Sequence, residues 1–316
     1  MKLLCDLNDF SEELRGGVVT IGNFDGVHRG HARLIRRLRK LADMIGRPAV
    51  VFTFDPHPAW ILRPDAAPQP LVWNERKAEI LAELGADVVV IYPADRAFLE
   101  LDAREFFERI VCRKLGARAM VEGPNFFFGR NRTGTLEVLS RFCAEADMRL
   151  EVADPVEVDG QVVSSSRIRA LIIEGRMAEA RQMLGRPYRI RGVVVRGAGR
   201  GSKLGYPTAN ISGIDTLLPA EGIYAGRAWV DRAAYAAAIS LGSNPTFDET
   251  ALKVEVYLLD FQGDLYDRRL QIDFFDRLRE TRRFDSVETL IDQMASDVAA
   301  TRSIAVEVEM EKKDEG

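Results

Sequence analysis

Residues 18–31 read VVTIGNFDGVHRGH, and residues 50–58 read VVFTFDPHP. Each segment begins with a short apolar run, as a strand buried on both faces does, and continues into turn residues and histidine. The three histidines of the chain, His28, His31 and His57, all lie in these two segments. Histidine is the side chain whose protonation changes near neutral pH, so their concentration at two strand ends indicates chemistry before packing.

Similar apolar runs recur through the first half of the chain, separated by stretches with helical spacing. In residues 31–46, leucines and isoleucines recur at the spacing of one helix face, with arginines on the other. Strands that alternate with helices predict a parallel, doubly wound α/β sheet, whose ligands bind at the carboxyl ends of the strands. The runs expected to be strands are 17–23, 48–54, 86–92 and 117–122.

The pattern changes after a helical pair at residues 166–185, in which Gly175 separates the helices and Gly185 ends the second. Strand-like runs then follow one another without helices between them, which predicts a small antiparallel barrel or sandwich. A C-terminal helix is expected after Ser286 as N-cap. We therefore expect an α/β domain at residues 1–185 and a β-barrel domain at 186–316. The later strands are expected at 188–195, 222–230, 233–242, 252–260 and 265–275.

Composition narrows the class of protein and its partners. The 316 residues carry a net charge of −4, so no overall basic field predicts nucleic acid or anionic membrane as a partner. Three widely separated cysteines, Cys5, Cys112 and Cys143, indicate neither a disulfide framework nor a cysteine metal site. With no apolar run near the length of a membrane span, we expect a cytoplasmic protein. The sequence leaves the oligomeric state open.

One stretch, from Arg181 to Ile214, contains seven basic residues and no acidic residue. Charge alone supports two interpretations equally, a phosphate contact or a solvated basic surface at a domain junction.

The turn after the first strand has the composition of a phosphate site. Gly22 and Gly26 allow close backbone approach, and the helix expected from about Gly30 directs its free N–H groups at a bound anion. His28 and His31, three residues apart across the helix start, can both donate hydrogen bonds to that anion. The alternative is a zinc pair with His57 or Asp25 as a third ligand.

Residues 196–210, RGAGRGSKLGYPTAN, form a glycine-rich basic loop with phosphate-binding character. Thr208 and Asn210 offer neutral oxygens for Mg²⁺, which takes few protein ligands. A plain turn, with Asn210 bonded to its own backbone, explains PTAN equally well from the residues alone. Besides Gly197 and Arg200, the residues expected to bind phosphate here are Gly199, Gly201, Lys203 and Gly205.

These motifs resemble those of known enzyme families. GNFDGVHRGH resembles the first signature of the nucleotidylyltransferase superfamily, and SSSRIRALIIEGRMAEARQMLGRPY resembles its second motif, although the serines could also simply cap a helix. GRGSKLGYPTANI, LLPAEGIYAG, ISLGSNPTF and the segments after them resemble the riboflavin kinase barrel. Together the halves resemble the bifunctional prokaryotic riboflavin kinases/FAD synthetases over about 300 residues. For ATP in the first half, the resemblance implies Gly22, Asn23, Phe24, Asp25, Gly30, Ser165 and Ser166, with His28, His31 and Arg169 catalytic.

The resemblance implies Mg²⁺ and the substrates ATP, riboflavin and FMN. It makes Glu255 the candidate general base of the kinase and places Arg279 and Glu280 at the flavin and the C-terminal lid, although a strand glutamate is more often merely solvated. Asn125 and Thr135, where aspartate is common, and Ser166, where threonine is usual, depart from the family pattern. In the first half, the flavin is expected against Asp55, Pro56, His57, Asn125, Phe126 and Phe128, with at least one phenylalanine in the core.

Two other functions remain open from the sequence. In the first, the barrel is an active kinase and the first domain only senses a nucleotide or flavin. In the second, the chain binds flavin without turnover. Intact His28 and His31 and an intact second motif favour the bifunctional enzyme over the first alternative.

Overall fold

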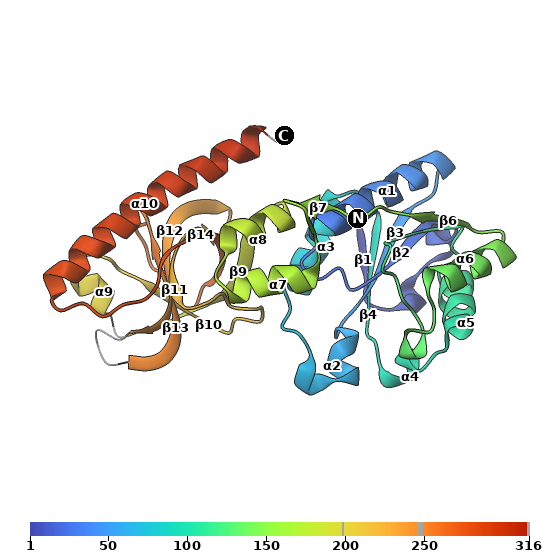
Figure 1. Cartoon of the computed structure of the whole chain (residues 1–316), viewed down its shortest axis with the longest axis horizontal. Coiled ribbons are helices and arrows are strands. Elements are labelled where there is room, and N and C mark those ends of the chain that lie inside the picture. The colour runs from blue at the N-terminus through green and yellow to red at the C-terminus, as the bar shows by residue number, and fades with distance from the viewer. Residues whose placement is uncertain (198, 245–248, 315–316) are drawn as a thin grey trace. The chain divides into compact units, whose positions relative to one another are not determined.

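A computed structural model describes residues 1–197, 199–244 and 249–314 (Figure 1). The chain divides into two compact units, Met1–Ser164 and Ser165–Gly316, which we describe separately.

The first unit is built on a six-stranded sheet in the order β1-β4-β3-β2-β5-β6, with every neighbouring pair parallel. The central strands are buried on both faces, which explains their continuous apolar sequences. The strands are β1 (Lys2–Leu4), β2 (Val18–Ile21), β3 (Ala49–Phe54), β4 (Val88–Tyr92), β5 (Ala119–Glu122) and β6 (Arg149–Val152).

Helices cover both faces of this sheet, so the doubly wound fold is confirmed. One core joins the sheet to α1 (Arg29–Ile45) and α3 (Asn74–Glu83). The other joins it to the remaining helices. These are α4 (Arg96–Leu99), α5 (Ala103–Phe106), its wider continuation η4 (Phe107–Lys114) and α6 (Leu136–Glu145).

Shorter elements complete the first unit. The helix α2 (Pro58–Leu62) follows β3, and the hairpin of β7 (Glu157–Val158) and β8 (Gln161–Val162) precedes the second unit. Short 3₁₀ turns are η1 (Leu7–Asp9), η2 (Glu12–Leu14), η3 (Pro64–Ala66) and η5 (Arg130–Arg132).

The second unit opens with the expected helical pair, α7 (Ser165–Ile173) and α8 (Met177–Leu184). Gly175 and Gly185 both have left-handed backbone angles, as their positions between and after the helices require. The pair packs with the barrel, α8 against β9 and β14, so the compact units divide before α7. The domain boundary expected after residue 185 remains a prediction.

The later strands form a closed antiparallel barrel in the order β10-β13-β12-β11-β14-β9, which decides between a barrel and a sandwich. Inward residues such as Ile190, Ile239 and Phe274 are fully buried and fill it. The strands are β9 (Tyr188–Val195), β10 (Ala209–Ser212), β11 (Gly222–Val230), β12 (Ala233–Asn244), β13 (Glu249–Leu258) and β14 (Arg269–Arg279).

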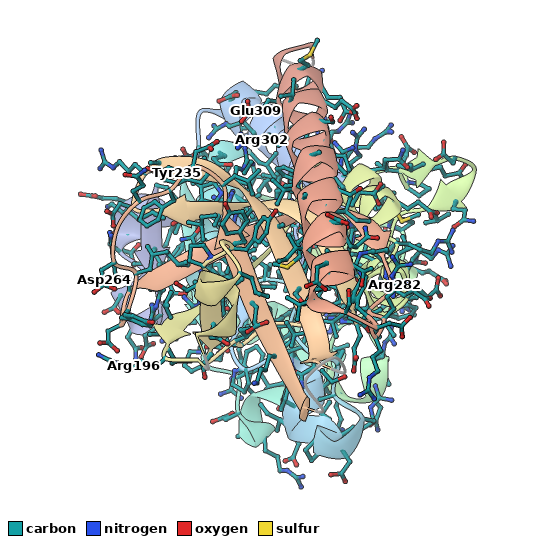
Figure 2. All side chains as sticks on the ribbon, turned by 90° about the vertical axis from the view of Figure 1, so that its left-hand side faces the viewer. Arg196, Tyr235, Asp264, Arg282, Arg302 and Glu309 are labelled. Carbon is teal, nitrogen blue, oxygen red and sulfur yellow. The ribbon has the colours of Figure 1, made fainter. Side chains whose placement is uncertain are left out.

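Two helices complete the second unit, α9 (Arg200–Lys203) and α10 (Val287–Asp314), which crosses the barrel (Figure 2). The Ser286 Oγ accepts the Thr289 N–H at 3.2 Å, which confirms the N-cap. Among the described residues, no helix is both long and apolar enough to cross a membrane.

Three arginines of the basic stretch from Arg181 to Ile214 pair with acidic residues outside the stretch. Arg181 pairs with Glu311, Arg189 with Asp273, and Arg191 with Asp215 at 2.7 Å. The Arg196 guanidinium lies 5.2 Å from the centre of the Tyr266 ring. Arg181, Arg189 and Arg191 therefore form ion pairs within the second unit, and phosphate binding by the rest of the stretch remains a prediction.

Candidate active sites

The first motif turns sharply between β2 and α1. Phe24, Gly26 and Val27 all have positive φ, and the Phe24 ring is 2% exposed. His28 is the N-cap of α1, where its Nδ1 accepts the His31 N–H at 3.3 Å. A neutral His28 ring therefore carries its proton on Nε2. Sequence analysis identified this helix start but not the capping role.

His28 and His31 lie together, as their spacing predicts. Their rings stack with centroids 3.7 Å apart. The Phe24 ring packs edge-to-face with the His31 ring, with centroids 5.2 Å apart. A Cβ at Gly30 would lie 3.1 Å from the His28 ring, so glycine at this position leaves room for the ring. The arrangement holds two imidazoles at one helix N-terminus, where anions are favoured.

Asp25 has a structural partner. Its carboxylate, 6% exposed, accepts the Leu71 N–H at 2.9 Å. In the described part of the chain, no three His, Cys, Asp or Glu side chains are grouped as metal ligands. The same region holds Lys77, a cation of α3 that sequence analysis missed. Burial lowers the pKa of Lys77, and the charges of Asp25 and Asp55 partly oppose this shift.

The histidine segment DPHP, residues 55–58, lies at the end of β3, beside β2. Asp55 and Pro56 are exposed and joined by a cis peptide bond. His57 is the N-cap of α2, and its Nδ1 accepts the Ala59 N–H at 3.1 Å. This segment therefore extends from the strand end next to the first motif.

The three phenylalanines after β5 point in different directions. Phe128 is 6% exposed and packs on Phe106 and Phe142, as expected for at least one of them. Phe126 is half-buried and stacks on Phe128 with centroids 5.5 Å apart. Phe127, which sequence analysis did not select, is 43% exposed, and Asn125 is exposed too.

The Thr135 departure has a local explanation. The Thr135 hydroxyl is the N-cap of α6 and accepts the Val138 N–H at 3.3 Å. Aspartate and threonine both serve as N-caps, so the change from the family's usual residue preserves this role.

In the barrel, the glycine-rich segment lies directly on the proposed magnesium donors. A Cβ at Gly197 would lie 2.2 Å from Asn210 Nδ2, and a Cβ at Gly201 would lie 3.2 Å from Thr208 Oγ1. Asn210 belongs to strand β10, so the interpretation of PTAN as a plain turn is wrong for Asn210. Gly199 and Gly205 have positive φ with open space around them, and the side chains of Arg200 and Lys203 lie outside the described part.

Glu255 faces the same segment across the sheet. Asn210 of β10 and Glu255 of β13 are direct partners in the antiparallel ladder, so both side chains leave the same face. Glu255 is half-buried. Close to this pair in the chain, Tyr206 and Tyr257 make an edge-to-face contact with ring centroids 5.4 Å apart. Alternation of buried Val254 and Val256 puts Glu255 on the outer face of the barrel, as the sequence predicts.

Arg279 connects the barrel to its C-terminal helix. Its guanidinium pairs with Asp297 of α10, at 2.8 Å from Nη2 to Oδ2. Glu280 is exposed. Of the second motif, Ser165 and Ser166 open α7, and Arg169 follows one turn later.

Both halves of the chain match known protein families. The family model described as FAD synthetase matches residues 10–167, and the model described as riboflavin kinase matches residues 184–305. A bifunctional riboflavin kinase/FMN adenylyltransferase of Pseudomonas fluorescens is 38% identical over 96% of this chain and 98% of its own length. The relative of the same name in Escherichia coli K12 is 32% identical over 96% and 97%. The chain belongs to the bifunctional riboflavin kinase/FMN adenylyltransferase family.

The family assignment confirms the order of the two halves. The FAD synthetase match covers strands β2 to β6 of the parallel sheet, and the riboflavin kinase match covers the barrel and most of α10. The helical pair lies largely between the two matches.

One solved structure is similar along nearly the whole chain. It is described as a macrolide-efflux protein from Streptococcus pneumoniae, with a TM-score of 0.85, 33% identity, and coverage of 95% of this chain and 98% of that one. Neither family model and neither relative above shares the efflux description. We therefore take the fold, and not the activity, from this similarity.

Proposed function

We propose that this chain converts riboflavin into FMN in its barrel and FMN into FAD in its α/β unit, using one ATP for each step. Membership of the bifunctional family supports both activities. The pairing of Asn210 with Glu255 beneath the glycine-rich segment is the observation that carries the assignment of the kinase site.

In the proposed kinase step, Glu255 takes the proton of the riboflavin 5′ hydroxyl. The hydroxyl oxygen forms a bond to the γ-phosphorus of ATP, the bond between that phosphorus and the bridging oxygen to the β-phosphate breaks, and ADP leaves. A carboxylate is adequate because phosphoryl transfer depends mainly on positioning and charge neutralisation. Backbone N–H groups at Gly199, Gly201 and Gly205, with Lys203, would bind the ATP phosphates.

The donor set fits Mg²⁺. Thr208 and Asn210 would hold the ion through neutral oxygens, as suits a cation that keeps most of its water and phosphate ligands. When bound, Mg²⁺ neutralises phosphate charge. The close packing of Gly197 and Gly201 against the two donors supports this assignment because it fixes their positions without filling the space with side chains.

In the proposed adenylyl transfer, an FMN phosphate oxygen forms a bond to the α-phosphorus of ATP and pyrophosphate leaves. No protein base is needed because the attacking phosphate is already an anion. The His28 Nε2–H and the stacked His31 ring would donate to charge that develops on the phosphates. Gly22, Asn23, Phe24, Asp25 and Gly30 would form the ATP turn. The participation of Ser165, Ser166 and Arg169 rests on the resemblance of the second motif alone.

Both flavin sites are proposals. In the α/β unit, the segments that carry the expected flavin residues follow β3 and β5, the two strands on either side of β2. Asp55, Pro56, His57, Asn125 and Phe126 would contact the flavin. Phe128 would act from beneath, since it is buried under Phe126. In the barrel, Arg279 would reach the flavin only if it left Asp297.

A cytoplasmic location suits an enzyme that consumes ATP and stays a prediction. The expected partners are the small-molecule substrates, without nucleic acid or membrane.

Incubation of the purified chain with riboflavin and MgATP, followed by chromatographic separation of the flavins, tests the proposal. FAD is the expected product. FMN alone would identify a kinase whose first unit only senses a ligand, and unchanged riboflavin would identify a binding protein without turnover.

A further inference from the structure

The two central strands of the sheet separate before they end. β2 pairs with β3 as far as Ile21 and Phe52, but with β5 only as far as Val19 and Met120. β5 itself remains paired with β6 to its last residue, Glu122. The strands therefore part from each other over their last two residues, at the carboxyl ends.

The Glu122 side chain occupies this separation. Glu122 is 1% exposed, and its Oε1 accepts the Ile21 N–H at 2.9 Å. A backbone carbonyl of a neighbouring strand would ordinarily accept such an N–H. Here a side chain 101 residues away in sequence takes that role. Its neighbours include Cys143 of the apolar core that joins the sheet to α6.

A carboxyl group is an unusual choice for this position because burying one is unfavourable. Burial raises the pKa of Glu122 well above its ordinary value, against the opposing effects of the Ile21 N–H and the nearby Thr20 hydroxyl. The sequence predicts Glu122 as the last residue of the strand expected at 117–122 and gives it no role in a site. An apolar residue would suit the surrounding core better, so packing alone does not account for the carboxyl group.

The place of Glu122 in the topology suggests a role. The chain runs from β2 to β3 on one side, while β5 lies on the other, so β2 and β5 flank the switch point where open α/β sheets bind ligands. The turn expected to bind phosphate begins at Gly22, directly after Ile21. The segment with the expected flavin residues Asn125 and Phe126 follows directly after Glu122.

We propose that the Glu122 side chain is a spacer that keeps the carboxyl ends of β2 and β5 apart and thereby positions the 22–31 turn for ATP. Glu122 is a positioning residue, which acts through the Ile21 backbone and touches no reacting atom. This inference rests on the proposed adenylyl transfer in the first unit. Loss of the acceptor would leave the Ile21 N–H without its bond and allow the strand ends to move together.

Two substitutions of similar size distinguish the effect of the hydrogen bond to the Ile21 N–H from the effect of the space that the Glu122 side chain fills. Glu122→Gln keeps an acceptor oxygen, whereas Glu122→Met fills the same space without one. With FMN supplied, the Gln variant should keep the wild-type KM for ATP. The Met variant should raise that KM by about tenfold or more, because small displacements in an active site are costly. Riboflavin phosphorylation should be unchanged in both.

A control substitution addresses a purely structural role. Asp87 accepts the Ala49 N–H at 2.9 Å. Ala49 is the first residue of β3, so this bond lies at the amino ends of the strands, opposite the end where Glu122 lies. Asp87→Ala should lower stability without changing the KM for ATP. If Glu122→Met behaves like Asp87→Ala, with lower stability and an unchanged KM, the spacer role is wrong.

A measurement independent of turnover distinguishes this inference from the proposed function. At a pH low enough for Glu122 of the folded wild-type protein to keep its proton, hydrogen–deuterium exchange in residues 20–31 should be faster in Glu122→Met than in wild type and unchanged in Glu122→Gln. If the wild-type chain forms no FAD from FMN, the proposed function fails, while the exchange data still test the spacer. Equal exchange in all three proteins would contradict it.

Discussion

Asn210 and Glu255 are direct partners across the β10–β13 ladder, on the outer face of the barrel and under the glycine-rich segment. Directly opposed residues of an antiparallel pair have Cβ atoms about 5 Å apart. The proposed magnesium donor and the proposed base are therefore fixed relative to each other by backbone hydrogen bonds. The separation of 45 positions in the sequence is bridged by the barrel rather than by a local turn.

Removal of the proposed base should silence only the kinase. Glu255→Gln keeps the size of the side chain but cannot take a proton, so we expect riboflavin phosphorylation to fall by about a hundredfold or more. Adenylylation of supplied FMN should persist. Rates measured with riboflavin and with FMN check this expectation, and a Gln variant that still phosphorylates riboflavin at the wild-type rate would remove Glu255 from the mechanism.

Crowding Asn210 should have a similar effect. A Cβ at Gly197 would lie 2.2 Å from Asn210 Nδ2, so Gly197→Ala must displace the amide, and we expect a higher magnesium requirement for the kinase. Gly213→Ala is the control, because Gly213 has a φ of +68° but open space around it. That control should lose about 1–2 kcal/mol of stability through strain with its magnesium dependence intact. Equal magnesium dependence in both variants would argue against Asn210 as a donor.

The buried Glu122 predicts a pH-dependent difference in stability. Its pKa is raised in the folded protein, so the folded state binds the proton more tightly than the unfolded state does. Its contribution is most favourable below the unfolded pKa of about 4.3 and is lost as the pH rises through the folded pKa. Exchange protection of β2 in Glu122→Gln, relative to wild type, should therefore improve as the pH rises. A relative protection that is independent of pH would show that Glu122 does not titrate in this way.

Two of the ion pairs that attach α10 should contribute differently to its stability. Arg279 pairs with Asp297, which is 7% exposed, so Arg279→Met would leave a buried carboxylate and cost about 3–5 kcal/mol. Arg302 pairs with Asp260 at the surface, and Arg302→Met should cost much less. Hydrogen–deuterium exchange of α10 checks both. Equal effects on the helix would contradict the importance of burial at Asp297.

Much of the fold follows from sequence periodicity because the central strands and long helices are strongly patterned. The strands β1 and β6 were missed for the opposite reason. β1 has only three residues and a mostly exposed pattern, and β6 mixes exposed and half-buried residues without an apolar run. The sequence pattern predicts β10 only as part of a loop because its four residues, ANIS, are too few to mark a strand. Only its pairing with β9 and β13 makes it a strand.

The sites show a similar division. The spacing of His28 and His31 predicts their proximity because both lie at one helix start. Spacing could not show that His28 also caps α1, nor which of three adjacent phenylalanines is exposed. Lys77 and Glu122 were missed because their significance depends on burial by strands and helices remote in sequence. The basic run was ambiguous for the same reason, since the carboxylates that pair with it come from elsewhere in the chain.

The division of labour between the two units is tested most directly by replacing both imidazoles and measuring both reactions in one sample. His28→Asn with His31→Asn retains an N-cap acceptor for α1 but removes the two ring donors. We predict that FAD formation from supplied FMN falls by about a hundredfold or more, while FMN formation from riboflavin stays at the wild-type rate. Equal loss of both reactions, or unchanged FAD formation, would contradict the account.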